Sequence, residues 1–285
     1  IMIKLRDALY KTNDCLKLTS SNIPPINERK IILKNILQKS DEFIAFNLEK
    51  NLEAKDIKTY KRFIIRRLNQ EPLAQIIKNK NFWKNNFFIN NSCLVPRFDS
   101  EVIIEAVIKT FKNKQQKLNI LDIGTGSGCL IISLLNEYKK SFGVGIDTSV
   151  KALQAANINK IKMFQKNRLR LINTSYKKYD PTDFDIIVTN PPYISKDEIN
   201  KISEEVKNFE PLRALYAQSN GLKHYKEIIL KLQNPKKKQI IFFEIGHKQS
   251  DVVTKLLKNN GFRILNVFND LSGIPRCIVT KKNFI

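Results

Sequence analysis

Apolar residues recur with two different spacings along this chain, and the change of spacing separates two kinds of structure. Up to about residue 85 they come at three- and four-residue intervals, as in Ile31-Ile32-Leu33 followed by Ile36-Leu37, the spacing of amphipathic helices. Residues 56–68 form another such helix, with Tyr60 and Phe63 on its inner face. This part carries no catalytic pattern, so we expect a small helical domain that recognises a partner.

After residue 98, short apolar runs alternate with amphipathic stretches. The pattern predicts strands near 118–122, 142–147, 168–172, 184–189, 239–245, 262–268 and 276–281. It predicts helices near 101–112, 127–138, 149–158, 221–233 and 248–259. Such alternation implies an α/β fold with a mainly parallel sheet and helices on both faces.

Between these parts, from Phe82 to Pro96, apolar and polar residues alternate in the way that is typical of a β-hairpin. Phe88-Ile89 and Cys93-Leu94-Val95 are the expected strands, with Asn90-Asn91-Ser92 as the turn. Ser100 is placed to cap the helix that follows. We therefore divide the chain into an N-terminal helical substrate-recognition domain, a hairpin linker and a catalytic domain, over residues 1–85, 86–97 and 98–285.

Composition narrows the class of protein. The 285 residues are 42% hydrophobic, enough to form a core, and the apolar runs are too short to span a membrane. The start of the chain lacks the apolar segment and cleavage site of a signal peptide. The four cysteines are scattered without a Cys-x-x-Cys pair, and two histidines support neither a metal site nor a Ser-His triad. We expect a cytoplasmic protein with reduced thiols and no bound metal.

The net charge of +23 is spread along the chain rather than held in a tail. An excess of this size suggests an anionic partner such as RNA. Lys, Ile and Asn are abundant everywhere, however, and an AT-rich coding sequence produces the same composition. Charge alone therefore does not identify a nucleic-acid substrate, and a nucleic-acid partner stays open.

A glycine-rich turn, Gly124-Thr125-Gly126-Ser127-Gly128, joins a predicted strand to a predicted helix. Its glycines let the backbone turn sharply and approach a ligand closely. A dinucleotide-binding turn has a similar form. Asp122, however, stands where a carboxylate can hold a ligand's ammonium group and would repel a pyrophosphate. Asp147 ends the next strand, about 20 positions after the glycines, where an acidic residue usually accepts from ribose hydroxyls.

The most informative segment is Asn190-Pro191-Pro192-Tyr193, which follows the apolar strand Asp185-Ile186-Ile187-Val188. Two prolines cannot continue a sheet, so the chain turns out at the strand's end. Because proline has no N–H, the loop offers carbonyl oxygens and one Asn side chain, with Tyr193 as an aromatic wall. Such a site is suited to accept hydrogen bonds from a flat NH2 group, either a side-chain amide or the exocyclic amine of a base.

The glycine turn, Asp147 and the Asn-Pro-Pro-Tyr loop all fall at the carboxyl ends of successive strands, where ligands bind in open α/β sheets. Together they resemble the class I S-adenosylmethionine-dependent amino-methyltransferases. The wider sequence resembles the HemK/PrmC family, the N5-glutamine methyltransferases that modify peptide chain release factors. The segments that carry this resemblance are Glu71 to Ile77 with Phe82-Trp83, Leu94 to Glu101, Phe209-Glu210-Pro211, Asn220-Gly221-Leu222, Phe243 to Gly246 with Gln249, and Asp270 to Gly273 with Arg276.

The resemblance implies methyl transfer from S-adenosylmethionine to the glutamine of the Gly-Gly-Gln motif of release factors. It implies catalytic roles for Asn190, Pro191 and Tyr193, with Pro192 as a further substrate contact. The implied cofactor contacts are Asp122, Gly124, Thr125, Gly126, Ser127, Gly128, Asp147, Ser175 and Asn190. Where the family often has an Asp-aromatic pair near the adenine, this chain has Thr174-Ser175. An N6-adenine methyltransferase acting on DNA or RNA is the alternative, since adenine also presents a flat NH2 group.

Overall fold

The computed structural model describes residues 2–20 and 22–282, which form two compact units. Residues up to 78, together with 204–209, make the first unit, and residues 79–203 and 210–282 make the second. Within the described ranges, no helix combines the length and the apolar character needed to cross a bilayer.

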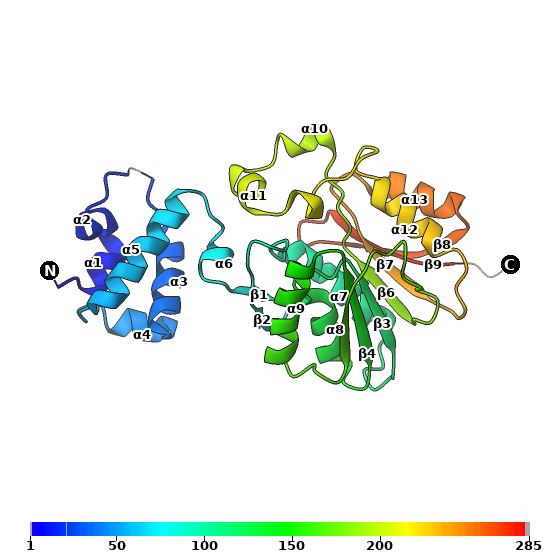
Figure 1. Cartoon of the computed structure of the whole chain (residues 1–285), viewed down its shortest axis with the longest axis horizontal. Helices are drawn as coiled ribbons and strands as arrows, with labels where there is room; N and C mark the ends of the chain where they lie inside the picture. Colours follow the sequence, from blue (N-terminus) through cyan, green and yellow to red (C-terminus); the bar gives the residue numbers. More distant parts are fainter. Residues whose placement is uncertain (1, 21, 283–285) are drawn as a thin grey trace. The chain divides into compact units, whose positions relative to one another are not determined.

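The first unit is helical, as predicted (Figure 1). Its helices are α1 (Leu5–Tyr10), α2 (Thr12–Leu16), α3 (Ile26–Leu37), α4 (Asp41–Phe46), α5 (Ala54–Leu68), α6 (Leu73–Ile76) and α11 (Glu204–Phe209). Helices α3 and α5 lie side by side. Tyr60 of α5 is fully buried, and its hydroxyl donates to the carbonyl of Ala8 at 2.7 Å. The apolar stripe read from the sequence is therefore the core of this bundle.

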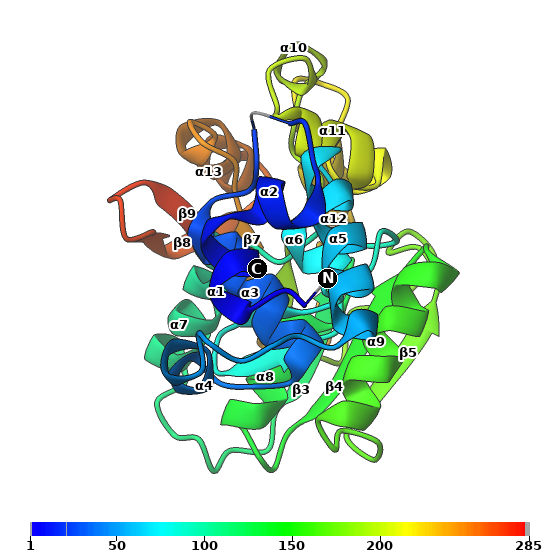
Figure 2. The same cartoon turned by 90° about the vertical axis from the view of Figure 1, so that its left-hand side faces the viewer.

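The second unit is built on a seven-stranded sheet. Its strands are β3 (Asn119–Ile123), β4 (Phe142–Asp147), β5 (Leu169–Asn173), β6 (Ile186–Thr189), β7 (Ile240–Glu244), β8 (Phe262–Asn269) and β9 (Pro275–Lys282). They lie in the order β5-β4-β3-β6-β7-β9-β8, in which β9 runs antiparallel to both of its neighbours, β7 and β8, and the other pairs are parallel. Figure 2 shows β5 at one edge of the sheet and β8 near the other. The predicted α/β fold with a mainly parallel sheet is confirmed.

Helices cover both faces of this sheet (Figure 1). On one face α7 (Glu101–Thr110), α8 (Cys129–Glu137) and α9 (Val150–Lys162) pack against the strands. On the other face α12 (Lys223–Lys231) and α13 (Ser250–Asn259) bury Tyr225, Ile228 and Leu257 against Ile187 and Phe243. Strands buried on both sides explain why the sequence shows continuous apolar runs instead of alternation.

The β-hairpin is real, but its predicted position is wrong. It pairs β1 (Lys80–Phe82) with β2 (Asn85–Phe87), and Phe82 and Phe87 are its buried residues. The predicted strand at Phe88 does not form, because the side chain of Asn159 takes the place of a neighbouring strand. Its Oδ1 accepts from the Phe88 N–H at 2.7 Å, and its Nδ2 donates to the Phe88 carbonyl at 3.0 Å.

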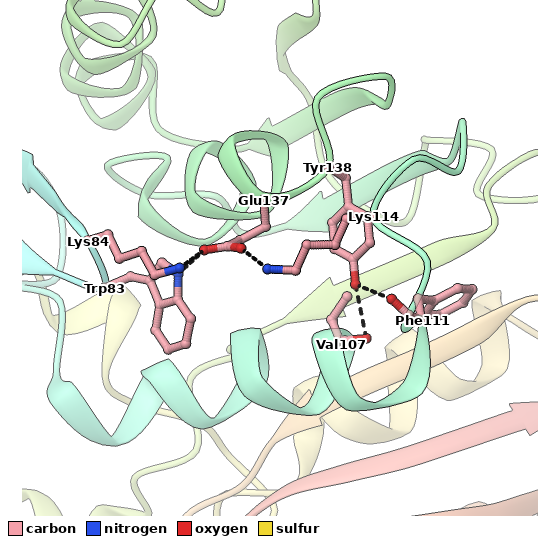
Figure 3. Close-up of polar contacts among 7 residues, drawn as sticks. All are labelled: Trp83, Lys84, Val107, Phe111, Lys114, Glu137 and Tyr138. Carbon is pink, nitrogen blue, oxygen red and sulfur yellow. Dashed lines mark hydrogen bonds and ion pairs between the residues drawn. The ribbon is translucent and has the colours of Figure 1, made fainter.

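Glu137, at the end of α8, ties the hairpin to the rest of this unit (Figure 3). Its carboxylate accepts from the indole N–H of Trp83 at 2.8 Å and from Lys84 at 2.6 Å. It also accepts from Lys114. The neighbouring Tyr138 donates from its hydroxyl to the carbonyls at the end of α7, so the two helices are joined at the same point.

Candidate active site

A cavity of about 590 Å3 opens at the carboxyl ends of β3, β4, β5 and β6. The chain order of the strands reverses around β3, since β4 and β6 lie on its two sides. Ligands of open α/β sheets bind at such a reversal point. The volume lies within the range of small-molecule sites, which is roughly 300–1,000 Å3.

The glycine-rich turn after β3 forms one wall of the cavity. Gly124, Thr125, Gly126 and Ser127 line it. Gly126 has a φ of +55°, a left-handed conformation that favours glycine. Its N–H donates to Oδ2 of Asp147 at 3.0 Å. The turn therefore presents its backbone to the cavity and is held there by the end of the next strand.

Asp147 lines the same cavity and is half-buried. Its second carboxylate oxygen, Oδ1, accepts from the N–H of Ser149 at 2.8 Å. Both oxygens are thus oriented by backbone N–H groups while each keeps capacity for a further donor. This geometry suits an acceptor for ligand hydroxyls.

Asp122 and Gly128 lie behind the cavity wall and are not among its lining residues. Asp122 is completely buried, and its Oδ2 accepts from the Thr125 hydroxyl at 2.7 Å. Burial raises the pKa of this carboxyl to about 7, and the Thr125 hydrogen bond opposes the rise. Gly128 allows close packing of helices, because a Cβ there would lie 3.1 Å from Ile132 and 3.4 Å from Ala156.

The Asn-Pro-Pro-Tyr loop follows β6, and its residues lie partly on the cavity and partly in the core. Asn190, Pro191 and Pro192 line the cavity. Tyr193 does not line it, since its ring packs on the α12 and α13 side of the sheet and against Gly246. The aromatic wall expected from the sequence is therefore not on the cavity surface in this structure.

Ser100 is nearly buried at the start of α7 and does not cap that helix, contrary to the sequence expectation. Its hydroxyl oxygen instead accepts from Nδ2 of Asn190 at 3.3 Å, and Ser100 also lines the cavity. The 3-10 turn at Phe98–Ser100 runs directly into the helix.

Ser175, for which the family resemblance implies a cofactor contact, lines the cavity beside residues that the sequence did not reveal. The Tyr176 hydroxyl donates to Glu227 at 2.5 Å and lies 2.9 Å from Nδ1 of His224. Lys177 also bonds to Glu227, at 2.9 Å. These four residues line the cavity, but they come from two segments about 50 positions apart and form no local motif.

A half-buried ion pair holds the linker over the cavity. Arg97 pairs with Glu210 at 2.5 Å, and the N–H of Val95 donates to the same carboxylate at 3.2 Å. Nearby, Arg213 donates to the Ser149 hydroxyl at 2.5 Å. Both Pro96 and Arg213 line the cavity.

Two features define a class I S-adenosylmethionine-dependent methyltransferase. The first is the strand order, in which the antiparallel strand β9 lies between β7 and β8. The second is the cavity that the glycine-rich turn and the Asn-Pro-Pro segment both line. Residues 100–208 match the methyltransferase small domain, and residues 7–77 match the PrmC N-terminal domain.

Curated relatives narrow the class to one family. A release factor glutamine methyltransferase of Thermodesulfovibrio yellowstonii is 32% identical over 97% of this chain and 98% of its own length. A bifunctional methyltransferase of Rickettsia prowazekii is 35% identical over 96% of this chain and 56% of its own length, so the chain spans about half of that relative.

Among solved structures, the release factor-specific protein-(glutamine-N5) methyltransferase of Alicyclobacillus acidocaldarius is 25% identical. It covers 70% of this chain and 100% of its own, with a TM-score of 0.40. On the evidence of its sequence relatives, the chain belongs to the family of release factor glutamine methyltransferases.

Proposed function

We propose that this chain transfers a methyl group from S-adenosylmethionine to the side-chain amide nitrogen of the glutamine in the Gly-Gly-Gln motif of peptide chain release factors. The observation that carries the proposal is the meeting of two loops on one cavity. Asn190 and Pro191 face the same space as the turn at Gly124 to Ser127 and Asp147. Membership of the family supports the choice of glutamine over adenine.

The residues around the cavity fit the cofactor. Gly126 leaves room, since a Cβ there would first meet Cys93 at 3.9 Å. Asp147 offers oriented oxygens to a ribose, and Ser175 stands at the end of the neighbouring strand. The buried oxygens Asp122 Oδ1 and Ser127 Oγ have no hydrogen-bond partner in the protein. We propose that Asp122 acts on the cofactor's ammonium group through Thr125 and the field of its charge, and that Gly128 acts by shaping the turn.

The substrate side of the site is proposed to orient an amide. An amide nitrogen is a poor nucleophile because its lone pair is shared with the carbonyl group. Oδ1 of Asn190 and the carbonyl of Pro191 accept the two N–H hydrogens, and Pro192, which lacks an N–H, places no competing donor beside them. This holds the lone pair toward the cofactor side of the cavity, which is mainly a positioning effect.

The bound cofactor supplies an electrophilic methyl group. The chain itself holds the substrate amide in place and stabilises the charge that develops on its nitrogen. Positive charge grows on the amide nitrogen as the new bond forms, and the same two acceptor oxygens stabilise it. The nitrogen then becomes acidic and loses a proton to water, so no strong base is required. Tyr193 is proposed to contribute from the core side, by supporting the loop and by meeting the substrate once the loop adjusts.

The proposed partner is a release factor, and nucleic acid is not required for the reaction. Release factors work in the cytoplasm, and we propose that this chain works there too. The net charge of +23 leaves contact with an RNA-bound substrate complex open.

Methyl transfer from labelled S-adenosylmethionine tests the proposal directly. Purified release factor is compared with a variant whose Gly-Gly-Gln glutamine is changed to alanine, and DNA and RNA are offered in parallel. We expect label on the unaltered release factor alone. Label on nucleic acid with none on release factor would instead support the adenine alternative.

A further inference from the structure

Asn190 and Glu244 stand side by side at the carboxyl ends of two neighbouring parallel strands. Thr189, the last residue of β6, pairs with Phe243 of β7, so Asn190, which follows β6 directly, comes next to Glu244, the last residue of β7. In-register neighbours on parallel strands direct their side chains to the same face of the sheet. Asn190 and Glu244 therefore share the face that α7 covers.

Ser100, at the start of α7, completes the group. Its hydroxyl oxygen accepts from Nδ2 of Asn190, so its own proton is available to another acceptor. The Glu244 carboxylate, whose residue is only 2% exposed, lies beside these two side chains, and its interactions with Ser100 and with Asn190 lower its pKa. The amide nitrogen of Asn190 thus donates to Ser100 on the buried side, and Oδ1 is the atom left for the cavity.

A purely structural explanation for Glu244 is weak. Burying a carboxylate costs free energy unless its oxygens are satisfied, yet Oε2 of Glu244 has no hydrogen-bond partner. An apolar residue fills the end of a buried strand without that cost. The nearby Arg276 pairs with Asp99 at 3.0 Å and with Asp270 at 2.9 Å instead of with Glu244.

We propose that Glu244, with Ser100, is a positioning residue that fixes the Asn190 amide so that Oδ1 faces the acceptor amide of the substrate. The inference rests on the proposed function and names a residue that acts through Asn190 without touching the substrate. Glutamate is suited to this task because an ionised carboxylate only accepts hydrogen bonds, so it selects the nitrogen end of the Asn190 amide.

The charge state of Glu244 makes the arrangement sensitive to pH. Burial raises its pKa to about 7, the Ser100 hydrogen bond and the charge of Arg276 oppose the rise, and Asp99 adds to it. The other titratable groups on which the charge of this carboxylate acts are Tyr193, Tyr225 on α12 and Cys277 on β9. Burial is the main cause that raises the pKa of each, and Glu244 adds to all three. Those groups stay neutral while Glu244 ionises as the pH rises through about 7.

The kinetic test compares Glu244→Gln and Ser100→Ala with the wild-type chain. Gln keeps the size of Glu but replaces one acceptor by a donor, which opposes the Asn190 NH2 group. We expect kcat to fall about 10- to 100-fold, as for a displaced reacting group, with the dissociation constant of the cofactor close to the wild-type value. Ser100→Thr, which keeps the hydroxyl, should recover most of the rate lost in Ser100→Ala.

The double variant Asn190→Ala with Glu244→Gln separates positioning from a merely structural role. If Glu244 acts through Asn190, the double variant loses no more rate than Asn190→Ala alone. Wild-type kcat should rise with pH through about neutrality, and Glu244→Gln should lose that rise. Additive losses, or an unchanged pH profile, would overturn the proposal.

A second readout needs no acceptor and so distinguishes this inference from the proposed function. The side-chain NH2 signals of Asn190 in a 1H–15N spectrum of the cofactor-bound chain are identified by their absence in Asn190→Ala. They should shift with pH in the wild type and stay constant in Glu244→Gln. If release factor is not methylated but the shift occurs, only the proposed function fails. If the Asn190 NH2 signals of the wild type do not shift with pH, the positioning role of Glu244 is wrong.

Discussion

Nε2 of Gln249 lies 3.1 Å from the backbone carbonyl oxygen of Tyr193, to which it donates a hydrogen bond. The same side chain accepts at Oε1 from the N–H of Gly246 at 3.0 Å and from the Tyr225 hydroxyl at 3.3 Å. One amide thus joins the loop after β6, the turn after β7 and helix α12. Gln249 therefore supports the loop that carries Asn190.

Replacing Gln249 with leucine is expected to slow turnover. The change leaves the Tyr193 carbonyl without its donor, and a loosened loop misplaces the acceptor groups. We expect kcat to fall about tenfold or more, with cofactor affinity nearly unchanged, measured by steady-state kinetics and calorimetry. Gln115→Leu alters an exposed glutamine in the loop after α7 and should have no effect. Equal rates in the two variants would show that the loop needs no such support.

Gly221 should tolerate no side chain. Its φ is +81°, and a Cβ there would lie 2.2 Å from the Tyr193 carbonyl oxygen. Gly273 is the matched control, because its φ is +78° but a Cβ meets nothing within 4 Å. Gly273→Ala should lower the free energy of unfolding by about 1–2 kcal/mol for the left-handed backbone alone. Gly221→Ala should lower the free energy of unfolding by roughly a further 1–3 kcal/mol because of the clash. Urea denaturation measures both, and similar losses would contradict the clash.

Asn190→Ala removes the proposed side-chain acceptor for the substrate amide. We expect the barrier to rise by about 3 kcal/mol, which is roughly a hundredfold loss of kcat. The dissociation constant of the cofactor should change far less, because the glycine turn and Asp147 remain in place. Single-turnover assays and calorimetry on the same preparation separate the two effects. Near-normal turnover on the true substrate would refute the proposed mechanism.

Asp147→Asn should weaken cofactor binding more than it slows turnover. The new amide places a donor against the N–H of Gly126 or Ser149 and removes the charge that strengthens hydroxyl hydrogen bonds. Loss of a charged hydrogen bond of this kind is worth about 1.5–3 kcal/mol, or roughly a 10- to 100-fold rise in the dissociation constant. Asp183→Asn, at an exposed position, serves as the control. An unchanged dissociation constant in Asp147→Asn would remove Asp147 from the cofactor site.

Glu137 should make the free energy of unfolding depend on pH below neutrality. Burial alone would raise the pKa of this carboxyl. Hydrogen bonds from Lys114, Lys84 and Trp83 outweigh burial and lower the pKa from 4.5 to about 2. Because the folded pKa is depressed, the stabilisation is present above pH 4.5 and is lost as the pH falls toward 2.

The size of that effect is on the order of 2 kcal/mol, since both lysines are partly exposed and solvent screens them. Glu137→Gln should therefore be less stable than wild type at pH 7, and the difference should shrink as the pH drops. Glu105→Gln changes a half-exposed carboxylate paired with Lys109 and is the comparison. Denaturation curves at several pH values decide the matter, and a constant difference would contradict the predicted linkage.

The strands and helices of the second unit were predictable because their patterns are local. A run such as Asp185 to Val188 is apolar since both faces of its strand are buried, and the prolines that follow end it wherever the strand lies in the sheet. The glycine turn was recognisable for a similar reason, because its positive φ values require glycine. Fold class and strand positions follow from such short-range constraints, and parallel strands then place both loops at the same edge of the sheet.

Other features depended on which segments meet in space. The hairpin lies earlier than predicted because Asn159, far along the chain, binds the backbone of Phe88. Ser100 has a good capping sequence, yet its hydroxyl is used by Asn190 instead of its own helix. Tyr176 and His224 form one cluster only because β5 and α12 border the same cavity. A local pattern specifies neither partner of such a pair.

The amino-acid order therefore specified the elements, the chemistry of the loops and the family, since each is encoded by neighbouring residues. Side-chain direction was set by packing across the sheet. Parallel register placed Glu244 beside Asn190, and the loop after β6 turns the Tyr193 ring toward the core. Strand pairing also buried Asp122 completely behind the glycine-rich turn, although the sequence predicted that Asp122 contacts the ligand. The physical reason is that a side chain's environment depends on strands that pair across the sheet, and strand pairing is a property of the whole folded chain.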